Sequence, residues 1–556
     1  MKRKIFIGVA WPYVNGDLHI GHLAGYLLPA DICARFHKAI GNDVLMVSGS
    51  DCHGTPITLE ADKKKTSPKE IVEYYHARDV ELFQKILKLS YNIYTRTDNP
   101  IHAEVTQEMF IRLLNNGYVF VDSSLQFYSK TEKRFLPDRY VKGECPHCGF
   151  KDSRSDQCDN CGKLIDSATL INPRSNISGD PVELRETQHY YVDWAKLQPK
   201  IQKFVEKEGP NWKNWVYQET LGWLNEGLKP RPVTRDIDWG VEIPKDRIPQ
   251  ELQIENIENK RFYVWFDAVI GYFSASVLWA KESGDSYEDF WFNSEAKHYY
   301  FMGKDNLPFH TLFWPGKLIS YDENINLPNL PSINSFLNLN GQQFSKSRGV
   351  TIDSRKFVED YGNDRVRFYL TLIMPEIKDS NFVWEDFKEK NNGVLVATIG
   401  NFIHRVLSIS KNVDSKQFEN FELSKSTSEA INFAFENSIK YLENCEFRNY
   451  LDEIIKLSSY GNHYVDSTKI WELDKNSNEF KNAVGNLVTV IIALAYLFKP
   501  LLFEASEKLF ELLNLQDSIT WPKDDFANHF SKALKGVEIS KNLKPLFEKI
   551  EEVPQN

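Results

Sequence analysis

A pair of histidines near the N-terminus could hold phosphate groups. His19 and His22 flank Gly21 in the segment Asp17–His22, which closely follows an apolar run at Ile5–Ala10. Imidazole rings donate hydrogen bonds to phosphate oxygens, and backbone N–H groups at the start of a helix add to them. Histidines at this spacing are more often incidental than catalytic. The two histidines therefore indicate a phosphate-binding site only if a second phosphate-binding group accompanies them.

That second group is Lys346, far along the chain. It follows Ser345 in the segment Phe344–Arg348, between Gly341 and Gly349. A lysine on a glycine-flanked loop can bring positive charge to a triphosphate when a carboxylate attacks the α-phosphorus and pyrophosphate leaves. A solvated loop lysine is the alternative interpretation. The two segments together predict activation of a carboxylate by ATP.

These residues must be positioned by a strand–helix–strand unit. We expect a strand at Ile5–Ala10, an amphipathic helix from Ile20 to about Lys38 that ends before Gly41, and a second strand at Val44–Val47. Such a unit binds ligands beyond the carboxyl ends of its strands, where Asp51 also lies. The sequence contains neither a G-x-x-x-x-G-K-[ST] phosphate loop nor a G-x-G-x-x-G motif after the first strand.

The chain resembles class I aminoacyl-tRNA synthetases, in which a His-x-Gly-His segment and a Lys-Met-Ser-Lys-Ser loop hold ATP from two sides. Further segments are similar to signatures of the methionyl-tRNA synthetase family. They are Ala10–Gly16, Gly49–Pro56, Tyr263–Ala268 and Gly303–Asp305, the last followed by His310 and Trp314. The resemblance runs from the N-terminus to at least Trp471. It implies a Rossmann-like α/β fold that forms an aminoacyl-adenylate.

Length and pattern divide the chain into several domains, because 556 residues exceed what one hydrophobic core supports. With the resemblance, we expect a Rossmann-like parallel-sheet catalytic domain at 1–117 and 228–325. A connective insertion with β-like stretches and zinc knuckles splits it at 118–227. A domain carrying the Ser-Lys-Ser loop follows at 326–390, and an α-helical anticodon-binding bundle occupies 391–556.

Four of the seven cysteines form two Cys-x-x-Cys knuckles. Cys145 and Cys148 form the first, Cys158 and Cys161 the second, and a glycine follows each. Four thiolates hold one zinc ion tetrahedrally and leave no open position for chemistry, so we expect one structural Zn²⁺ per chain. Disulfides are the alternative, but the odd cysteine count argues for a reducing compartment. No thioredoxin-like unit surrounds the motifs, which argues against a redox role.

Composition and apolar patterning bear on partners and location. A net charge of −10 argues against nonspecific coating of nucleic acid, yet it allows a local basic patch for tRNA. The longest apolar run, Leu487–Phe498, is too short to span a bilayer and is followed by Pro500, so we expect a buried helix of a bundle. Lys2–Lys4 precedes an apolar run without a signal-peptide cleavage site. We therefore expect a cytoplasmic protein without a membrane partner.

The resemblance implies roles for individual residues. ATP, with its Mg²⁺, is implied to contact His19, Gly21, His22, Asp305, Ser345 and Lys346. His19, His22 and Lys346 are the implied catalytic residues, and Asp305 is implied to lie at the ribose. Methionine offers only an apolar chain and a weak thioether acceptor, so its pocket needs aromatic walls and a carboxylate for the ammonium group. The candidates are Trp11, Tyr13, Asp51, Trp265, Tyr272, His310 and Trp314.

In the helical part, Asn401 and Arg405 lie four residues apart on one helix face. The resemblance places them and Trp471 at the anticodon of tRNA(Met), where an indole can stack on an unpaired base. A solvated helix face and ordinary aromatic packing are the alternatives. The chain departs from the family pattern where Gln343 and Phe344 replace the usual Lys-Met, which removes one positive charge from the loop.

The predicted function is ATP-dependent ligation of methionine to its tRNA through methionyl-adenylate. A small-molecule nucleotidylyltransferase is one alternative, but it does not explain the zinc knuckles or the helical domain. A noncatalytic tRNA-binding protein is another, but it would be expected to lose His22, Lys346 or Asp51, and all three are present. No additional dimer-forming tRNA-binding module precedes Asn556, so we expect a monomer, to which a separate chain could supply that module.

Overall fold

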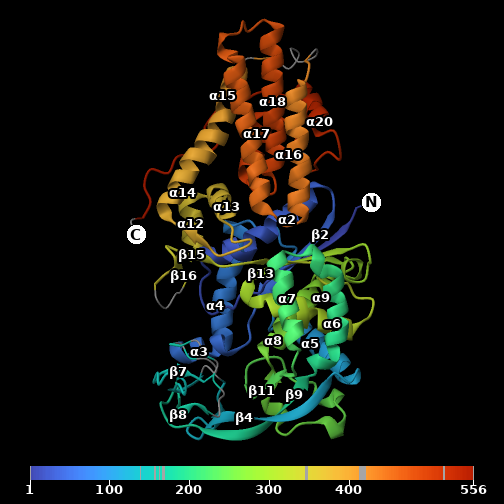
Figure 1. Ribbon diagram of the computed structural model, residues 1–556, viewed down its shortest axis with the longest axis vertical. Coiled ribbons are helices and arrows are strands. Elements are labelled where there is room, and N and C mark those ends of the chain that lie inside the picture. The colour runs from blue at the N-terminus through green and yellow to red at the C-terminus, as the bar shows by residue number, and fades with distance from the viewer. Residues whose placement is uncertain are drawn as a thin grey trace.

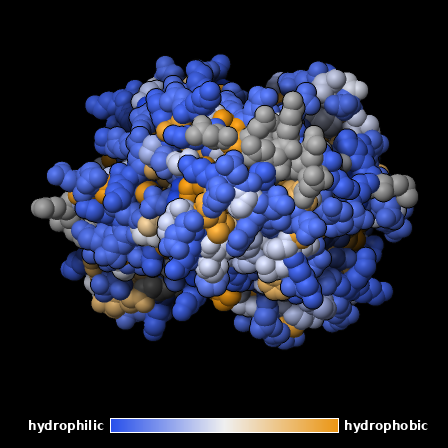
Figure 2. Space-filling model, turned by 90° about the horizontal axis from the view of Figure 1, so that it is seen from above, coloured by the Kyte–Doolittle hydropathy of each residue, from blue (hydrophilic) through white to orange (hydrophobic). Residues whose placement is uncertain are grey.

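The computed structural model describes all residues except 1, 138–139, 156–157, 159, 162, 164, 166–168, 345–348, 412, 414–420, 517–519 and 555–556. The predicted ATP-binding residues Ser345 and Lys346 lie outside the described residues. The molecule is elongated, with a helical bundle at one end, the insertion at the other and the catalytic sheet between them (Figure 1). Seen from above, its surface is mostly hydrophilic, with small scattered apolar areas (Figure 2).

The catalytic domain is built on five parallel strands in the order β14-β13-β1-β2-β3. Their bounds are Lys4–Val9 (β1), Asp43–Ser50 (β2), Ile93–Arg96 (β3), Lys297–Gly303 (β13) and Leu330–Asn334 (β14). The chain runs outward from β1 on one side and from β13 on the other. The carboxyl ends of β1 and β13 therefore form the switch point, where open α/β sheets bind their ligands. Because β14 belongs to the sheet, the sheet continues past the predicted boundary at residue 325.

The helix after β1 is confirmed and is longer than expected by one residue. It consists of α1 (Ile20–His22), a π-helical turn η1 (Leu23–Leu27) and α2 (Leu28–Ala39). Pro29 has no N–H to donate to the preceding turn, which accounts for the wide turn before it. Gly41, with φ of +83°, then reverses the chain into β2.

The catalytic domain contains further helices, of which α9 packs on β2 and β3 and α10 packs on β1. They are α3 (Thr55–Lys64), α4 (Pro68–Glu81), α5 (Pro100–Asn115), α8 (Val264–Asp267), α9 (Gly271–Ser283), α10 (Glu288–Trp291) and α11 (Trp314–Tyr321). The region after β14 contains β15 (Leu337–Leu339), β16 (Gln342–Gln343), α12 (Ser354–Tyr361), α13 (Asn363–Leu372) and β17 (Ser380–Phe382). In this region β15 pairs with both β16 and β17 in a small sheet of its own.

The insertion contains strands, as predicted, and two helices that its β-like pattern does not predict. A long hairpin-like pair, β4 (Val119–Ser129) and β9 (Glu183–Val192), extends from the catalytic domain. The cysteine knuckles lie around a small sheet of β6 (Val141–Glu144), β7 (Ser153–Arg154) and β8 (Ile171–Ser175). Helices α6 (Trp194–Glu208) and α7 (Asn214–Glu226) return to the catalytic domain, where α6 packs on α11.

The C-terminal part is helical, as predicted. A continuous helix of α14 (Trp384–Lys390), η13 (Asn391–Gly400) and α15 (Asn401–Ser410) leads into it. The bundle contains α16 (Lys425–Glu443), α17 (Phe447–Thr468), α18 (Asn478–Phe498), α19 (Phe503–Leu512) and α20 (Phe526–Ala533). Trp384–Ser410 and Asn478–Phe498 are long and apolar enough to cross a membrane, but 89% of the apolar window of the second is buried in the protein. The run Leu487–Phe498 is thus a core helix, as expected.

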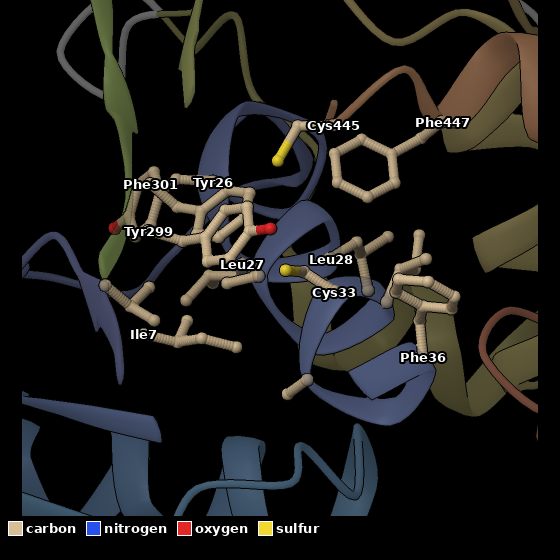
Figure 3. Packing of buried hydrophobic residues seen from close by; sticks show 14 of the residues in the cluster. Ile7, Tyr26, Leu27, Leu28, Cys33, Phe36, Tyr299, Phe301, Cys445 and Phe447 are labelled. Atoms are coloured by element: carbon tan, nitrogen blue, oxygen red, sulfur yellow. The ribbon is translucent and has the colours of Figure 1, made fainter. Parts of the chain in front are cut away.

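The bundle shares one hydrophobic core with the catalytic domain. Cys33 and Phe36 of α2 and Phe301 of β13 lie near Cys445 and Phe447, where α17 begins (Figure 3). A buried ion pair joins the same parts, because Arg367 of α13 lies 2.8 Å from Asp31 of α2 and donates to backbone carbonyls at the end of α18. The helix that begins at His19 is therefore packed directly against the bundle.

Candidate active site

A cavity of about 580 Å³ opens at the switch point of the sheet. Segments after β1, β2, β13 and β14 line it, together with α8 and the end of β16. Of the predicted ATP and methionine residues that the structure describes, its lining contains Trp11, Tyr13, His19, Gly21, His22, Asp51, Trp265, Tyr272, Asp305 and His310. Residues from distant parts of the sequence thus meet in one place. Trp314 does not line the cavity.

The two histidines are held together where the helix begins. His19 precedes the helix with extended backbone, and its N–H donates to Nδ1 of His22 at 3.2 Å. The ring centroids are 3.9 Å apart. Backbone hydrogen bonds also join this segment to Ile352 and Ser354, just beyond the Ser-Lys-Ser loop. The first predicted phosphate-binding segment is therefore hydrogen-bonded to the chain that follows the second predicted one.

Phe344 has a role that the sequence did not reveal. Its ring stacks on His19, with centroids 4.6 Å apart and planes 7° from parallel. A Cβ atom at Gly21 would lie 2.9 Å from the His19 ring and 3.2 Å from Phe344, so only glycine fits beneath the pair. Where the family pattern has Lys-Met, this chain has Gln343 and Phe344. The loop therefore lacks the lysine at position 343 but has an aromatic contact between Phe344 and His19.

Asp51 is a buried carboxylate without a cationic partner among the described residues. It is 3% exposed, lies just after β2, and accepts one long hydrogen bond from the backbone N–H of His53 at 3.3 Å. Burial, and then the charge of Asp267, raises its pKa well above the usual range. A buried carboxylate without a counter-charge binds a cation favourably, because the cation replaces the stabilisation by water that burial removed.

The neighbouring carboxylate Asp267 is stabilised in the opposite way. It is fully buried, and its Oδ2 lies 2.6 Å from Nδ1 of His53 and 3.7 Å from Nε2 of His102. Burial alone would raise its pKa, but the two imidazoles hold it below the usual range. Asp267 belongs to the Tyr263–Ala268 signature, which gave no hint of this partnership. Asp267 does not line the cavity, and its negative charge disfavours ionisation of the nearby Asp51.

The apolar end of the cavity is kept uncharged. Nδ1 of His310 donates to the backbone carbonyl of Asn306 at 2.9 Å, so Nε2 must accept, and the Tyr272 hydroxyl donates to it at 2.8 Å. Burial lowers the pKa of His310 to about 4, so the imidazole is neutral at physiological pH. Trp314 lies behind this pair and donates to the Tyr300 hydroxyl at 3.1 Å. A thioether side chain would meet aromatic rings and neutral polar groups here.

Two glycines make room for the indole of Trp11. Cβ atoms at Gly49 and Gly271 would lie 2.3 Å and 2.7 Å from the Trp11 indole. The ring is therefore wedged between β2 and the start of α9. At the other end of the cavity, burial raises the pKa of Asp305, and the neighbouring Lys304 is 2.8 Å from Asp379. Lys304 thus holds the region of β17 rather than the cavity.

The four knuckle cysteines converge in a separate cluster. Their sulfur atoms all lie within 4.8 Å of one another, with Cys145 and Cys161 3.9 Å apart and Cys148 and Cys158 3.7 Å apart. These distances exclude disulfides, whose sulfur atoms are about 2.05 Å apart. A tetrahedron of Zn–S bonds of about 2.3 Å has edges of about 3.8 Å. The cluster therefore has the dimensions of a four-thiolate metal site.

The predicted anticodon residues lie on α15 and just after α17, in the helical part at the opposite end of the molecule from the insertion (Figure 1). Trp471 is 52% exposed, and the Arg405 guanidinium lies 4.8 Å from its ring centroid and 2.9 Å from Asp466. Asn401 is exposed one turn earlier on the same helix. The structure thus brings Arg405 and Trp471 together at the surface, whereas packing against the core would have buried the indole.

Comparisons with known proteins agree with this geometry. Residues 5–407 match the family of class I tRNA synthetases (M), and residues 419–555 match the anticodon binding domain of methionyl tRNA ligase. The methionine–tRNA ligase of Roseiflexus castenholzii is 41% identical over 531 residues, which is 93% of this chain and 88% of that protein. That of Thermococcus kodakarensis is 39% identical over 535 residues, or 93% of this chain and 71% of the other.

The fold is also found among solved structures. The methionyl-tRNA synthetase of Mycobacterium tuberculosis, in complex with methionyl-adenylate, superposes with a TM-score of 0.75 at 22% identity, covering 98% of this chain and 100% of that one. The likeness covers the catalytic sheet, the insertion and the helical bundle alike. By its sequence matches and its architecture, this chain belongs to the methionyl-tRNA synthetase family.

Proposed function

We propose that this protein activates methionine with ATP to methionyl-adenylate and transfers the methionyl group to tRNA(Met). The observation that carries this function is Asp51, a buried carboxylate that has no cationic partner among the described residues and lines a cavity with aromatic walls. It suits an α-ammonium group, and the uncharged pocket of Tyr272 and His310 suits a thioether side chain. Family membership and the two phosphate-binding segments support the same reaction.

The residues divide the work by position. His19 and His22, at the start of the helix, suit the phosphates of ATP, and Lys346 adds charge as pyrophosphate leaves. Asp305 suits the ribose, and Mg²⁺ accompanies the triphosphate. Stacking of Phe344 fixes the ring of His19 although the first loop lysine is missing. The helical domain, with Asn401, Arg405 and Trp471, reads the anticodon.

Amino-acid-dependent exchange of pyrophosphate into ATP tests this proposal. With each of the twenty amino acids in turn, we expect exchange with methionine and much weaker exchange with leucine, isoleucine, valine and cysteine. Faster exchange with any of these would overturn the specificity. Exchange with none of the twenty would favour a noncatalytic tRNA-binding protein or a nucleotidylyltransferase. A nucleotidylyltransferase exchanges pyrophosphate only in the presence of the small molecule that accepts its nucleotidyl group.

The cysteine cluster should hold one structural zinc ion per chain. Cys158→Ser removes one thiolate, so we expect metal analysis to find clearly less than one zinc per chain and the insertion to become sensitive to proteases. Cys33→Ser removes a buried thiol far from the cluster and should retain the metal. A wild-type protein that is folded and active but free of metal would contradict a required zinc site.

A further inference from the structure

A buried histidine behind the active-site cavity contacts both acidic residues of this region. Among the described residues, the carboxylate of Asp51 accepts a hydrogen bond from the backbone N–H of His53, and Nδ1 of the same histidine lies 2.6 Å from Oδ2 of Asp267. The indole N–H of Trp239 fixes the turn by donating to the backbone carbonyl of Cys52 at 2.6 Å. Neither His53 nor Asp267 lines the cavity. Any effect of His53 on methionine must therefore pass through Asp51.

The two buried carboxylates oppose each other electrostatically. Burial, and next the negative charge of Asp267, disfavour ionisation of Asp51. The α-ammonium group of methionine, however, needs an ionised carboxylate as its partner. A fully buried charge such as that of Asp267 is tolerated only when a cation close to it compensates the charge. The nature of that cation therefore decides how easily Asp51 ionises.

His53 is better placed than His102 to supply this counter-charge. The ring of His53 donates to Asp267 at 2.6 Å, whereas Nε2 of His102 is 3.7 Å from the same oxygen. His102 is fully buried, and its Nδ1 lies 2.8 Å from the Ser274 hydroxyl. Burial lowers the pKa of His102, although the charge of Asp267 acts in the opposite direction, so this ring is neutral at physiological pH. The positive charge beside Asp267 is thus that of His53.

The other titratable groups around this pair are neutral, partly charged or already paired. Asp98, on which the charge of His53 also acts, is neutralised by Arg96 at 2.5 Å. Burial lowers the pKa of Lys317 to about 7, and its ammonium donates to a backbone carbonyl at 2.7 Å. Burial also raises the pKa of the Cys52 thiol, which is therefore neutral. None of these groups replaces the imidazole as a full counter-charge.

We propose that His53 is a positioning residue for methionine: its imidazolium balances the charge of Asp267 and so allows Asp51 to ionise and bind the α-ammonium group. The inference rests on the proposed function. His53 does not itself touch the substrate. Its backbone N–H donates to Oδ1 of Asp51 at 3.3 Å, while its ring holds the turn after β2 against α8. One residue thus sets both the place and the charge of the methionine-binding carboxylate.

His53→Asn separates the charge of this residue from its hydrogen bond, because an amide N–H can replace Nδ1–H but is uncharged. In methionine-dependent pyrophosphate exchange, the KM for methionine should rise about tenfold at neutral pH, with the kcat and the KM for ATP little changed. The midpoint, at which methionine affinity has fallen to half its high-pH value, should move up by about one pH unit, because one pKa unit is a tenfold change. A midpoint equal to that of the wild type would overturn the proposal.

His102→Asn is the matched control, because its ring lies beside the same carboxylate but is neutral. The midpoint of this variant should move much less than that of His53→Asn. An equal displacement in both variants would mean that loss of any buried ring in this region disturbs Asp51, and the proposal would fail.

Asp267→Asn in the His53→Asn background tests the charge balance directly. With both charges removed, the KM for methionine should return close to the wild-type value. A histidine that only packs the turn would not be rescued, since the second substitution adds a further disturbance. If circular dichroism shows that the double variant is unfolded, the midpoint of His53→Asn at an unchanged KM for ATP decides the question.

Failure of this inference differs from failure of the proposed function. If the proposed function is wrong, the wild type itself will show no methionine-dependent exchange of pyrophosphate. If only the role of His53 is wrong, the wild type will exchange with methionine, and His53→Asn will do so with the same midpoint.

Discussion

Asp51→Asn should weaken methionine binding by roughly 30- to 4,000-fold. The substitution keeps the shape of a side chain that is 3% exposed and removes only its charge. Truncating one partner of a buried, hydrogen-bonded charge pair costs about 2–5 kcal/mol, which sets this range. Because an amide offers no counter-charge to the α-ammonium group, the KM for methionine in pyrophosphate exchange should rise while the KM for ATP changes little. A variant that binds methionine normally would remove Asp51 from the site.

Asp267→Asn is the matched control, because the two buried carboxylates have opposite pKa shifts. The pKa of Asp51 is raised in the folded protein, so this group lowers stability as pH rises from the unfolded value through the folded one. Asp51→Asn should therefore leave the Tm at neutral pH unchanged or higher. The pKa of Asp267 is lowered, so its contribution is present at neutral pH and is lost as pH falls through the folded value. Asp267→Asn should accordingly lower the Tm.

Methionine affinity of the wild type should also depend on pH. The ammonium group binds the ionised carboxylate, whereas burial in the free protein raises the pKa of Asp51. Affinity should therefore fall as pH falls through the raised pKa of the free protein, well above the range of an ordinary aspartate. Titration calorimetry with methionine at a series of pH values, from the ordinary aspartate range upward, would measure this fall in affinity. In Asp51→Asn this pH dependence of methionine affinity should be absent. If it persists, a titrating group other than Asp51 causes it.

The sequence predicted the elements of the catalytic site because their chemistry is local. The apolar run before His19 gives β1, the amphipathic pattern gives the helix 20–39, and strand ends place Asp51 at the cavity. The cysteine spacing predicted the convergence of the four cysteines for the same reason, since each knuckle is a single turn. In these cases the residues that determine the structure lie within a few positions of one another.

What escaped prediction depends on contacts between distant segments. The stacking of Phe344 on His19 joins residues from two domains, and the pairing of Asp267 with His53 joins α8 to the end of β2. Trp314 could not be placed behind the cavity from its motif, because only packing decides which aromatic ring lies in front. Periodicity also missed α6 and α7, which follow directly on a β-rich region. The domain boundaries and the roles of the anticodon residues stay predictions.

Trp471→Ala should reduce tRNA charging by roughly ten- to a hundredfold and leave pyrophosphate exchange nearly intact. One stack of a base on an aromatic side chain is worth about 1–3 kcal/mol, which gives this range. The indole is 52% exposed and is held in place by Arg405, whose guanidinium lies over its ring. Trp471 lies between α17 and α18 of the bundle, whereas Asp51 follows β2 of the catalytic sheet, so loss of the indole does not act on methionine directly (Figure 1).

Two aromatic residues of the same domain separate anticodon contact from packing. Phe433 on α16 is 60% exposed. Phe433→Ala should preserve tRNA charging, pyrophosphate exchange and the Tm. Reduced charging would mean that any exposed ring on the bundle contributes to tRNA binding. Trp521 is 2% exposed, and its indole N–H donates to the backbone carbonyl of Tyr496 at 3.0 Å. Trp521→Ala should therefore lower the Tm. Trp471→Ala could instead behave like Trp521→Ala, losing pyrophosphate exchange and tRNA charging together and melting at a lower temperature by circular dichroism. That result would mean that Trp471 packs the bundle. Charging lost alone, at an unchanged Tm, means that the exposed indole contacts the tRNA.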